Sequence, residues 1–140
     1  MMGSGGVGGY FGARMASGGS DVTFIARGEH LTAIQSHGLR VDSRDMGNIT
    51  IYPANATKTP AEVGVVDCVV VAVKLWDTEE TGRAILPMLG SETAVLSLQN
   101  GVEGDGVQGF PQKKLSCVLM HIPCWNLKTL LLMYVLCSVT

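Results

Sequence analysis

Apolar side chains recur at helical spacing in three stretches of the chain, and each stretch is followed by glycine. Such a glycine is typical of a helix end, because it readily adopts the backbone conformations that close the last turn. The third stretch is preceded by Asp77 with a glutamate three residues on, the pattern of a capped helix start. We therefore predict helices over residues 6–17, 29–37 and 77–89, and one helical turn at residues 60–63.

Short apolar runs rich in β-branched residues lie between these helices. Asp21–Ala26, Asp67–Val73 and Ala94–Leu98 are almost continuously apolar, which is typical of strands covered on both faces. Leu39–Val41 and Asn48–Tyr52 have an extended pattern and are predicted to pair as antiparallel edge strands. Strands that alternate with helices at this spacing predict an α/β fold with a doubly wound parallel sheet and right-handed crossovers.

Length, charge and cysteine content narrow the possible classes of function. At 140 residues the chain is at most one ordinary domain. Its net charge of −2, with 16% charged residues, gives no basic surface, so we expect no nucleic-acid partner. No export signal leads the chain, and a cytoplasmic location is expected. Cys68 falls in a predicted strand, where we expect a buried thiol, and no disulfide framework is predicted.

A glycine-rich loop, Gly3-Ser4-Gly5-Gly6-Val7-Gly8, lies directly before the first predicted helix. In a G-x-G-x-x-G loop the first glycine permits a sharp turn, the second lets the backbone approach a pyrophosphate, and the third lets the helix pack on a strand. The phosphates bind free amides at the helix N-terminus. All six loop residues are therefore predicted to bind a dinucleotide. Only Met1 and Met2 precede the loop, so the predicted Rossmann-like sheet lacks most of its first strand.

Polar side chains follow the predicted strands at their carboxyl ends, where open α/β sheets bind ligands. Arg27 lies nineteen residues after Gly8, and an arginine there suits a 2′-phosphate, which favours NADP(H) over NAD(H). Lys74 is expected at the rim of the cleft, near the nicotinamide or a substrate carboxylate. Asn100 suits ribose hydroxyls or a small polar substrate. Plainer interpretations are a solvated arginine, a surface lysine and a turn asparagine.

Other polar and aromatic residues receive structural interpretations. His30 and His37 are expected on the exposed face of the second helix, and Glu79 and Glu80 are favourable charges at the start of the third. Trp76 is expected to pack against the protein and not to stack on a ligand. The cysteines and histidine near the C-terminus lack the close paired spacing of zinc ligands, so no metal site is predicted.

The chain changes character after Gly109, where glycine and acidic residues vanish. Leu115–Thr140 is rich in leucine, methionine and cysteine, without caps or turn signals. A proline and a lysine interrupt it, and its clean apolar stretch is half the length that a bilayer requires, so a membrane span is not expected. We predict that residues 1–109 form the nucleotide-binding domain and that residues 110–140 are a tail without an assigned fold.

Four ordered segments, GSGGVGGYFGARMA, DVTFIARGEHLTAIQSHGL, VVVAVKLWDTEE and VLSLQNGVE, resemble the N-terminal NADP-binding domain of the ketopantoate reductase (2-dehydropantoate 2-reductase) family. The resemblance covers roughly residues 2 to 108. It implies NADPH-dependent reduction of 2-dehydropantoate to pantoate, on the route to pantothenate and coenzyme A. It also implies that Gly3–Gly8 bind the pyrophosphate, Arg27 the 2′-phosphate, and Lys74 and Asn100 the nicotinamide and substrate side of the cleft.

The sequence departs from this family pattern at both ends. Family members carry a short apolar strand before the glycine loop and continue into a helical domain that supplies the catalytic lysine and most contacts to the 2-oxo acid substrate. Neither is found here, so we expect a truncated product that is inactive alone, with no catalytic residue assigned. The alternatives are a non-catalytic NADP-binding module whose tail docks on a partner or membrane, and a non-functional, aggregation-prone product.

Overall fold

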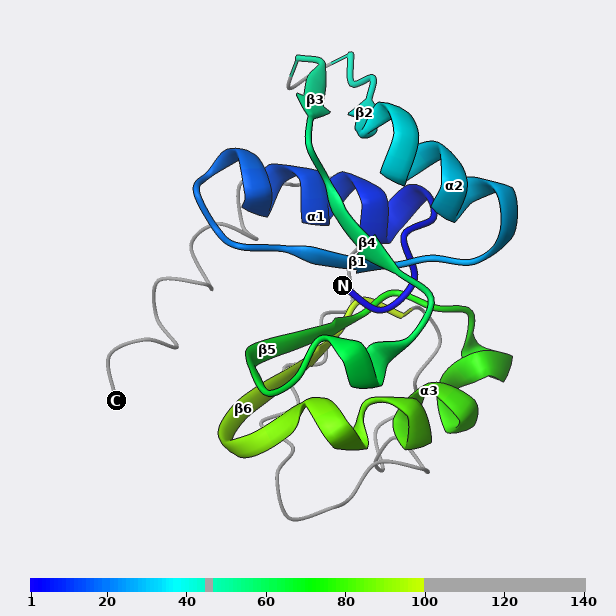
Figure 1. The fold of residues 1–140 in the computed structure, drawn as a ribbon, viewed down its shortest axis with the longest axis vertical. Coiled ribbons are helices and arrows are strands. Elements are labelled where there is room, and N and C mark those ends of the chain that lie inside the picture. The colour runs from blue at the N-terminus through cyan, green and yellow to red at the C-terminus, as the bar shows by residue number, and fades with distance from the viewer. Residues whose placement is uncertain (45–46, 100–140) are drawn as a thin grey trace.

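Helices and strands alternate along the chain, except for the consecutive strands within residues 39–57, in the computed structural model, which describes residues 1–44 and 47–99 (Figure 1). The strands are β1 (Thr23–Ile25), β2 (Leu39–Val41), β3 (Ile49–Ile51), β4 (Asn55–Thr57), β5 (Val66–Val71) and β6 (Leu89–Ser97). The α-helices are α1 (Gly6–Ser17), α2 (Gly28–His37) and α3 (Thr78–Ala84). Three 3-10 turns are η1 (Pro60–Glu62), η2 (Leu75–Asp77) and η3 (Leu86–Met88).

Two parallel strand pairs form the centre of the fold. β1 pairs with β4, with Phe24 opposite Ala56, and β5 pairs with β6, with Val70 opposite Leu96. The pairs are joined through Met2, which bridges both β1 and β5 in the parallel sense. The resulting spatial order is β4, β1, Met2, β5 and β6, and Figure 1 shows the N-terminus between β1 and β5. The predicted doubly wound parallel sheet is confirmed.

Met1 and Met2 lie at the central position of the sheet, where their backbones form hydrogen bonds with both neighbouring strands. The Met2 amide donates to the Val70 carbonyl at 2.7 Å, and the Ala72 amide donates to the Met2 carbonyl at 2.8 Å. On the other side, the Ile25 amide donates to the Met1 carbonyl at 2.9 Å. Two residues thus connect both halves of the sheet, and both of their side chains are buried.

Hydrophobic side chains cover both faces of this sheet. Along β5, Val70 belongs to one buried cluster, whereas Val69 and Val71 belong to the other, as the alternation of a strand requires. The first cluster receives Ala13 from α1 and Ile34 from α2, among others. The second cluster contains side chains that follow α3 along the chain, Ile85 and Met88. Helical segments therefore pack on opposite faces, which is the layering that defines a doubly wound fold.

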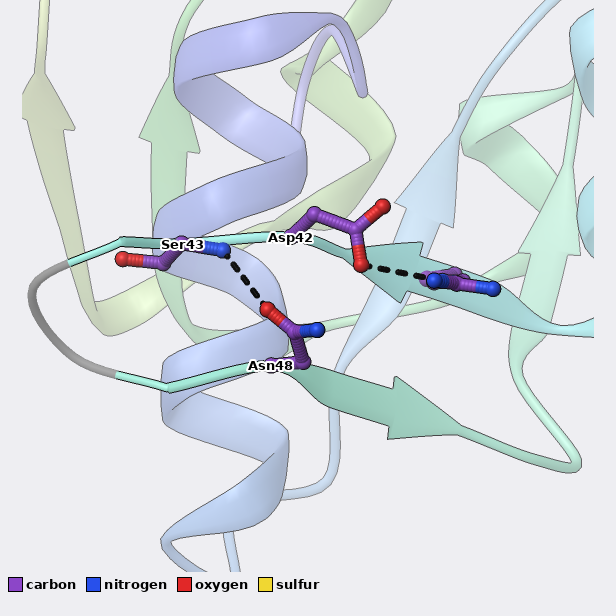
Figure 2. A network of polar contacts seen from close by, with 4 residues as sticks. Asp42, Ser43 and Asn48 are labelled. Atoms are coloured by element: carbon purple, nitrogen blue, oxygen red, sulfur yellow. Dashed lines mark hydrogen bonds and ion pairs between the residues drawn. The ribbon is translucent and has the colours of Figure 1, made fainter.

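β2 and β3 form a separate antiparallel pair, as the sequence predicted, with Leu39 opposite Ile51. Figure 2 shows two polar contacts near the connection between the two strands. The Ser43 amide donates to Asn48 Oδ1 at 3.1 Å, and Arg40 Nε donates to Asp42 Oδ1 at 3.0 Å (Figure 2). The pair lies beside α1, on the outer side of the half that holds β1 and β4 (Figure 1).

The prediction of one helix over residues 77–89 is wrong in its second half. α3 ends at Ala84, and β6 already begins at Leu89 and includes Gly90. Pro87 lacks the amide hydrogen that a continuing α-helix needs, which ends the helix. Thr93 Oγ1 accepts from the Gly90 amide at 2.8 Å and donates to the Val66 carbonyl at 2.5 Å, which ties Gly90 to β5. Asp77 precedes α3 but makes no capping hydrogen bond with its side chain.

Two further expectations need correction, and one strand was not expected. Cys68 is exposed, since the buried side chains of β5 are the last three, Val69–Val71. Trp76 is 80% exposed on the turn η2 and does not pack against the described residues. β4 was not predicted from the sequence, since its three residues Asn-Ala-Thr are extended through parallel pairing with β1 and not through an apolar pattern.

None of the helices within residues 1–44 and 47–99 is long and apolar enough to cross a membrane. The predicted tail over residues 110–140 and the end of the predicted domain at 100–109 lie outside the described residues.

Candidate nucleotide-binding site

Two glycines of the loop before α1 are required by the fold itself. Gly3 has φ of +85°, a conformation that side chains disfavour, and a Cβ there would lie 2.9 Å from Val73 Cγ1. At Gly8 a Cβ would lie 1.9 Å from the Gly3 carbonyl oxygen and 3.0 Å from Ala72 Cβ. The first and third glycines of the motif therefore allow the tight turn and the close approach of α1 to the end of β5.

The glycines between them have a different environment. A Cβ at Gly5 or Gly6 would meet no atom of the described residues within 4 Å beyond its chain neighbours and its own helix, so nothing in the described fold excludes a side chain there. Gly5 is the N-cap of α1 and offers no side-chain cap. The amides of Gly6, Val7 and Gly8 have no hydrogen-bond partner among the described residues, as expected for a first helical turn. Open backbone and free amides at the positive end of a 12-residue helix fit a pyrophosphate.

Ser4 and His30 fix the loop to the adjacent strand and helix. Ser4 is buried, and its hydroxyl donates to the Ile25 carbonyl at the end of β1 at 3.1 Å. His30 is exposed on α2, as expected, but its Nε2 lies 2.7 Å from the Ser4 carbonyl oxygen. Because a carbonyl only accepts, Nε2 carries the proton in this contact. Nothing in the sequence pattern indicates this anchoring role for His30, since the two residues are 26 positions apart.

Arg27 follows β1 and is the N-cap residue of α2. Its side chain is 73% exposed, and Nη2 lies 2.9 Å from Glu80 Oε1 on α3. The guanidinium therefore stands at the carboxyl end of β1, where the sequence predicted a contact to the 2′-phosphate. Glu80 was expected only as a charge at a helix start, and its partnership with Arg27 was missed.

Lys74 follows β5 and is the residue directly before η2, with an exposed side chain. The backbone around it is held by Gln99, a buried residue that follows β6. Gln99 Nε2 donates to Thr78 Oγ1 at 2.7 Å, to the Val73 carbonyl at 3.1 Å and to the Lys74 carbonyl at 3.4 Å. On its other side, Gln99 Oε1 accepts from Ser97 Oγ at 3.1 Å. Gln99 thus ties the end of β6 to the end of β5 and to the start of α3.

The ends of β1, β5 and β6, together with the glycine loop, form what we term the carboxyl edge of the sheet. Its parts are neighbours in space. The glycine loop lies against Ile25 and His30 on one side and against Ala72 and Val73 on the other. Gln99 then connects β5 to β6. The structure therefore brings together all the predicted site residues that it describes. Asn100, predicted to bind ribose or substrate, lies outside the described residues.

Among the described residues, two groups with a displaced pKa lie at the opposite, amino end of the strands. Burial lowers the pKa of the Met1 amino group, with a smaller opposing effect of Cys68, and this group donates to the Thr23 carbonyl at 2.8 Å. Desolvation raises the pKa of the Cys68 thiol, which the nearby amino group partly offsets. Within the described part of the chain, no group of three or more His, Cys, Asp or Glu side chains could hold a metal ion.

A parallel sheet with helices on both faces and a glycine loop at its carboxyl edge defines a Rossmann-type nucleotide-binding domain. The family model described as ketopantoate reductase PanE/ApbA matches residues 1–112 of the sequence. The chain belongs to the ketopantoate reductase family.

Relatives and solved structures agree with this assignment. The 2-dehydropantoate 2-reductase of Mesorhizobium japonicum is 39% identical over 103 residues, which is 73% of this chain and 31% of the relative. The PanE/ApbA family ketopantoate reductase from Ralstonia eutropha JMP134 superposes with a TM-score of 0.72 at 35% identity, over 83% of this chain and 39% of that one. For the 2-dehydropantoate 2-reductase from Geobacter metallireducens the TM-score is 0.68 at 34% identity, over 72% and 33%. The chain therefore spans about a third of the length of these relatives.

Proposed function

We propose that this protein binds NADP(H) at the carboxyl edge and serves the NADPH-dependent reduction of 2-dehydropantoate to pantoate. The single observation that carries the proposal is the loop before α1, where open backbone at Gly5 and Gly6 adjoins three amides that have no hydrogen-bond partner within residues 1–44 and 47–99. The family of the chain supports the reaction, since its relatives carry the name 2-dehydropantoate 2-reductase. The guanidinium of Arg27 supports NADP(H) over NAD(H).

In this proposal the residues of the carboxyl edge have separate roles. The amides of Gly6, Val7 and Gly8 bind the pyrophosphate, and Ser4 and His30 hold the loop in place. Arg27 binds the 2′-phosphate with its planar fork of donors. Lys74 lies on the nicotinamide and substrate side, and Gln99 positions the backbone that carries it. When bound, NADPH supplies the hydride for the ketone carbon.

The proposed domain, residues 1–109, is the cofactor-binding part of this reaction. By the family resemblance, the group that protonates the developing alkoxide and most contacts to the 2-oxo acid belong to the helical domain of the longer relatives. We therefore expect the 140-residue chain to bind NADPH but to reduce 2-dehydropantoate little by itself. A steady-state assay with both compounds checks this, and turnover equal to that of a full-length relative would contradict it.

Equilibrium titration with NADPH and with NADH tests the cofactor assignment. The intact chain should bind NADPH more tightly, and Arg27→Ala should weaken NADPH binding by about tenfold or more while leaving NADH binding nearly unchanged, because only NADPH carries the 2′-phosphate. Arg83→Ala is the matched control, since Arg83 is an exposed arginine of α3 that pairs with Glu79 on its own helix. Equal losses for both dinucleotides in Arg27→Ala would refute the assignment of Arg27.

A further inference from the structure

The ion pair between Arg27 and Glu80 joins residues from the two halves of the sheet. Arg27 follows β1, whereas Glu80 lies on α3, which follows β5. The two residues are 53 positions apart, and their charged atoms lie 2.9 Å apart. Both side chains are largely exposed, at 73% and 66%. The pair therefore lies in solvent at the carboxyl edge, where the proposed 2′-phosphate contact is made.

A carboxylate at this position competes with an incoming phosphate. It occupies donors of the same guanidinium, and its negative charge repels a group that carries nearly two negative charges. Exposed ion pairs are weak, so a phosphate can displace Glu80 from Arg27. The displaced carboxylate nevertheless stays on α3, beside the arginine with which it had paired, and its negative charge still opposes the phosphate. Conversely, a carboxylate is the group that accepts a hydrogen bond from the 2′-hydroxyl of NADH.

We propose that Glu80 is a specificity-determining residue that reduces the preference of this site for NADPH over NADH. Arg27 favours the cofactor with the 2′-phosphate, and Glu80 opposes it. The inference rests on the proposed function, because it needs a dinucleotide whose ribose lies beside Arg27. It goes beyond that function by assigning an opposing role to a residue of the second half of the domain.

The chain offers a matched control one residue away. Glu79 is also an exposed glutamate on α3, but it pairs with Arg83 on the same helix, four residues on. Glu79→Gln therefore removes the same charge from the same helix without freeing Arg27. Both substitutions keep the size of the side chain and lie on an exposed helical surface, so neither is expected to alter folding.

The test is the dissociation constant of NADPH and of NADH, measured by titration for the intact chain, Glu80→Gln and Glu79→Gln. Glu80→Gln should raise the preference for NADPH over NADH by about three- to tenfold, mainly through tighter NADPH binding, with a melting temperature lowered by a few degrees at most, because Glu80 is also a favourable charge in the first turn of α3. Glu79→Gln should change this preference less than about twofold.

Two outcomes contradict the inference in different ways. The role of Glu80 would be overturned if Glu80→Gln left the preference for NADPH over NADH unchanged, reduced it, or gave the same preference as Glu79→Gln. In that case, NADPH binding by the intact chain would still support the proposed function. Failure of all three proteins to bind either dinucleotide would overturn the proposed function and this inference with it.

Discussion

At the scale of single residues, neighbouring glycines of the loop serve different purposes. Gly8 is required by packing, because a Cβ would lie 1.9 Å from the Gly3 carbonyl oxygen. Gly6, two positions earlier, has open space where its Cβ would be. The sequence motif predicts glycine at the positions that need it, but only the structure separates glycines required by packing from those where a Cβ would meet open space.

Gly8→Ala should therefore destabilise the folded chain by about 1–3 kcal/mol or more, since backbone at Gly3 must shift to admit the methyl group. Gly6→Ala is the control and should leave the free energy of unfolding unchanged or raise it by up to about 1 kcal/mol, because alanine favours helix. Urea denaturation of both variants measures the difference. Equal stabilities of the two variants would show that the loop is not packed against β5 as described.

The structural role of Gln99 could not be predicted from the sequence. It precedes Asn100, which was given a binding role, while its own amide proved to be the buried link between the ends of β5 and β6. In the intact chain the Gln99 amide group donates to three acceptors. In Gln99→Glu a carboxylate that repels these acceptors takes the place of this donor, so the substitution should lower the free energy of unfolding by about 1–3 kcal/mol.

Gln35→Glu is the matched control for this substitution, because the exposed Gln35 also donates to a carbonyl, that of Ala56, but at the surface. It should change the free energy of unfolding by less than about 0.5 kcal/mol. Because Gln99 positions the Lys74 backbone, we also expect Gln99→Glu to weaken NADPH binding in titrations, and Gln35→Glu to leave it unchanged. Equal effects of the two substitutions would remove the positioning role of Gln99.

At the scale of elements, the central position of the sheet is held by two residues. Met1 and Met2 pair with β1 on one side and Met2 with β5 on the other, so the amino group of Met1 lies between both strands, beside Thr23. Burial lowers the pKa of this amino group from 8.0, and desolvation raises the pKa of Cys68 from 9.0. The two shifts predict opposite slopes of stability against pH.

Between the lowered pKa and 8.0, the unfolded chain keeps a proton on the Met1 amino group that the folded chain has lost, so the free energy of unfolding rises with pH. Above 9.0 the unfolded chain loses the Cys68 proton that the folded chain retains, and the free energy of unfolding falls. Urea denaturation of the 140-residue chain between about pH 7 and 10 measures both slopes. Cys68→Ser should abolish the fall and keep the rise, and a fall that persists in this variant would contradict the assignment.

Helices and strands could be predicted where the hydrophobic pattern of their own residues defines them. α1 has the predicted bounds, and the antiparallel pairing of β2 and β3 is confirmed. β4 and the start of β6 were missed for a shared reason, since their extended backbone is set by partners distant in sequence. β4 pairs with β1, and the hydroxyl of Thr93 ties Gly90 to β5.

At the scale of the whole molecule, a topological rule predicted more of the site than any single motif. Parallel strands end at one edge, so the residues that follow them were expected together, and the structure places Arg27, Lys74 and the glycine loop there. The rule could not predict the contacts across that edge, because they depend on how the two halves meet. The pair of Arg27 with Glu80 and the hydrogen bonds of Gln99 are of this kind.

The central claim is that the open glycines before α1 receive the pyrophosphate of NADPH. Its most direct test is the melting temperature of the chain with and without NADPH, for the intact protein and for Gly5→Ala, whose methyl group meets no protein atom within 4 Å. We predict that NADPH raises the melting temperature of the intact chain. Gly5→Ala should melt a few degrees lower without NADPH, because alanine is a poorer N-cap than glycine, and it should bind NADPH at least about tenfold more weakly. An equal NADPH-induced shift in both proteins, or none in the intact chain, would contradict the account.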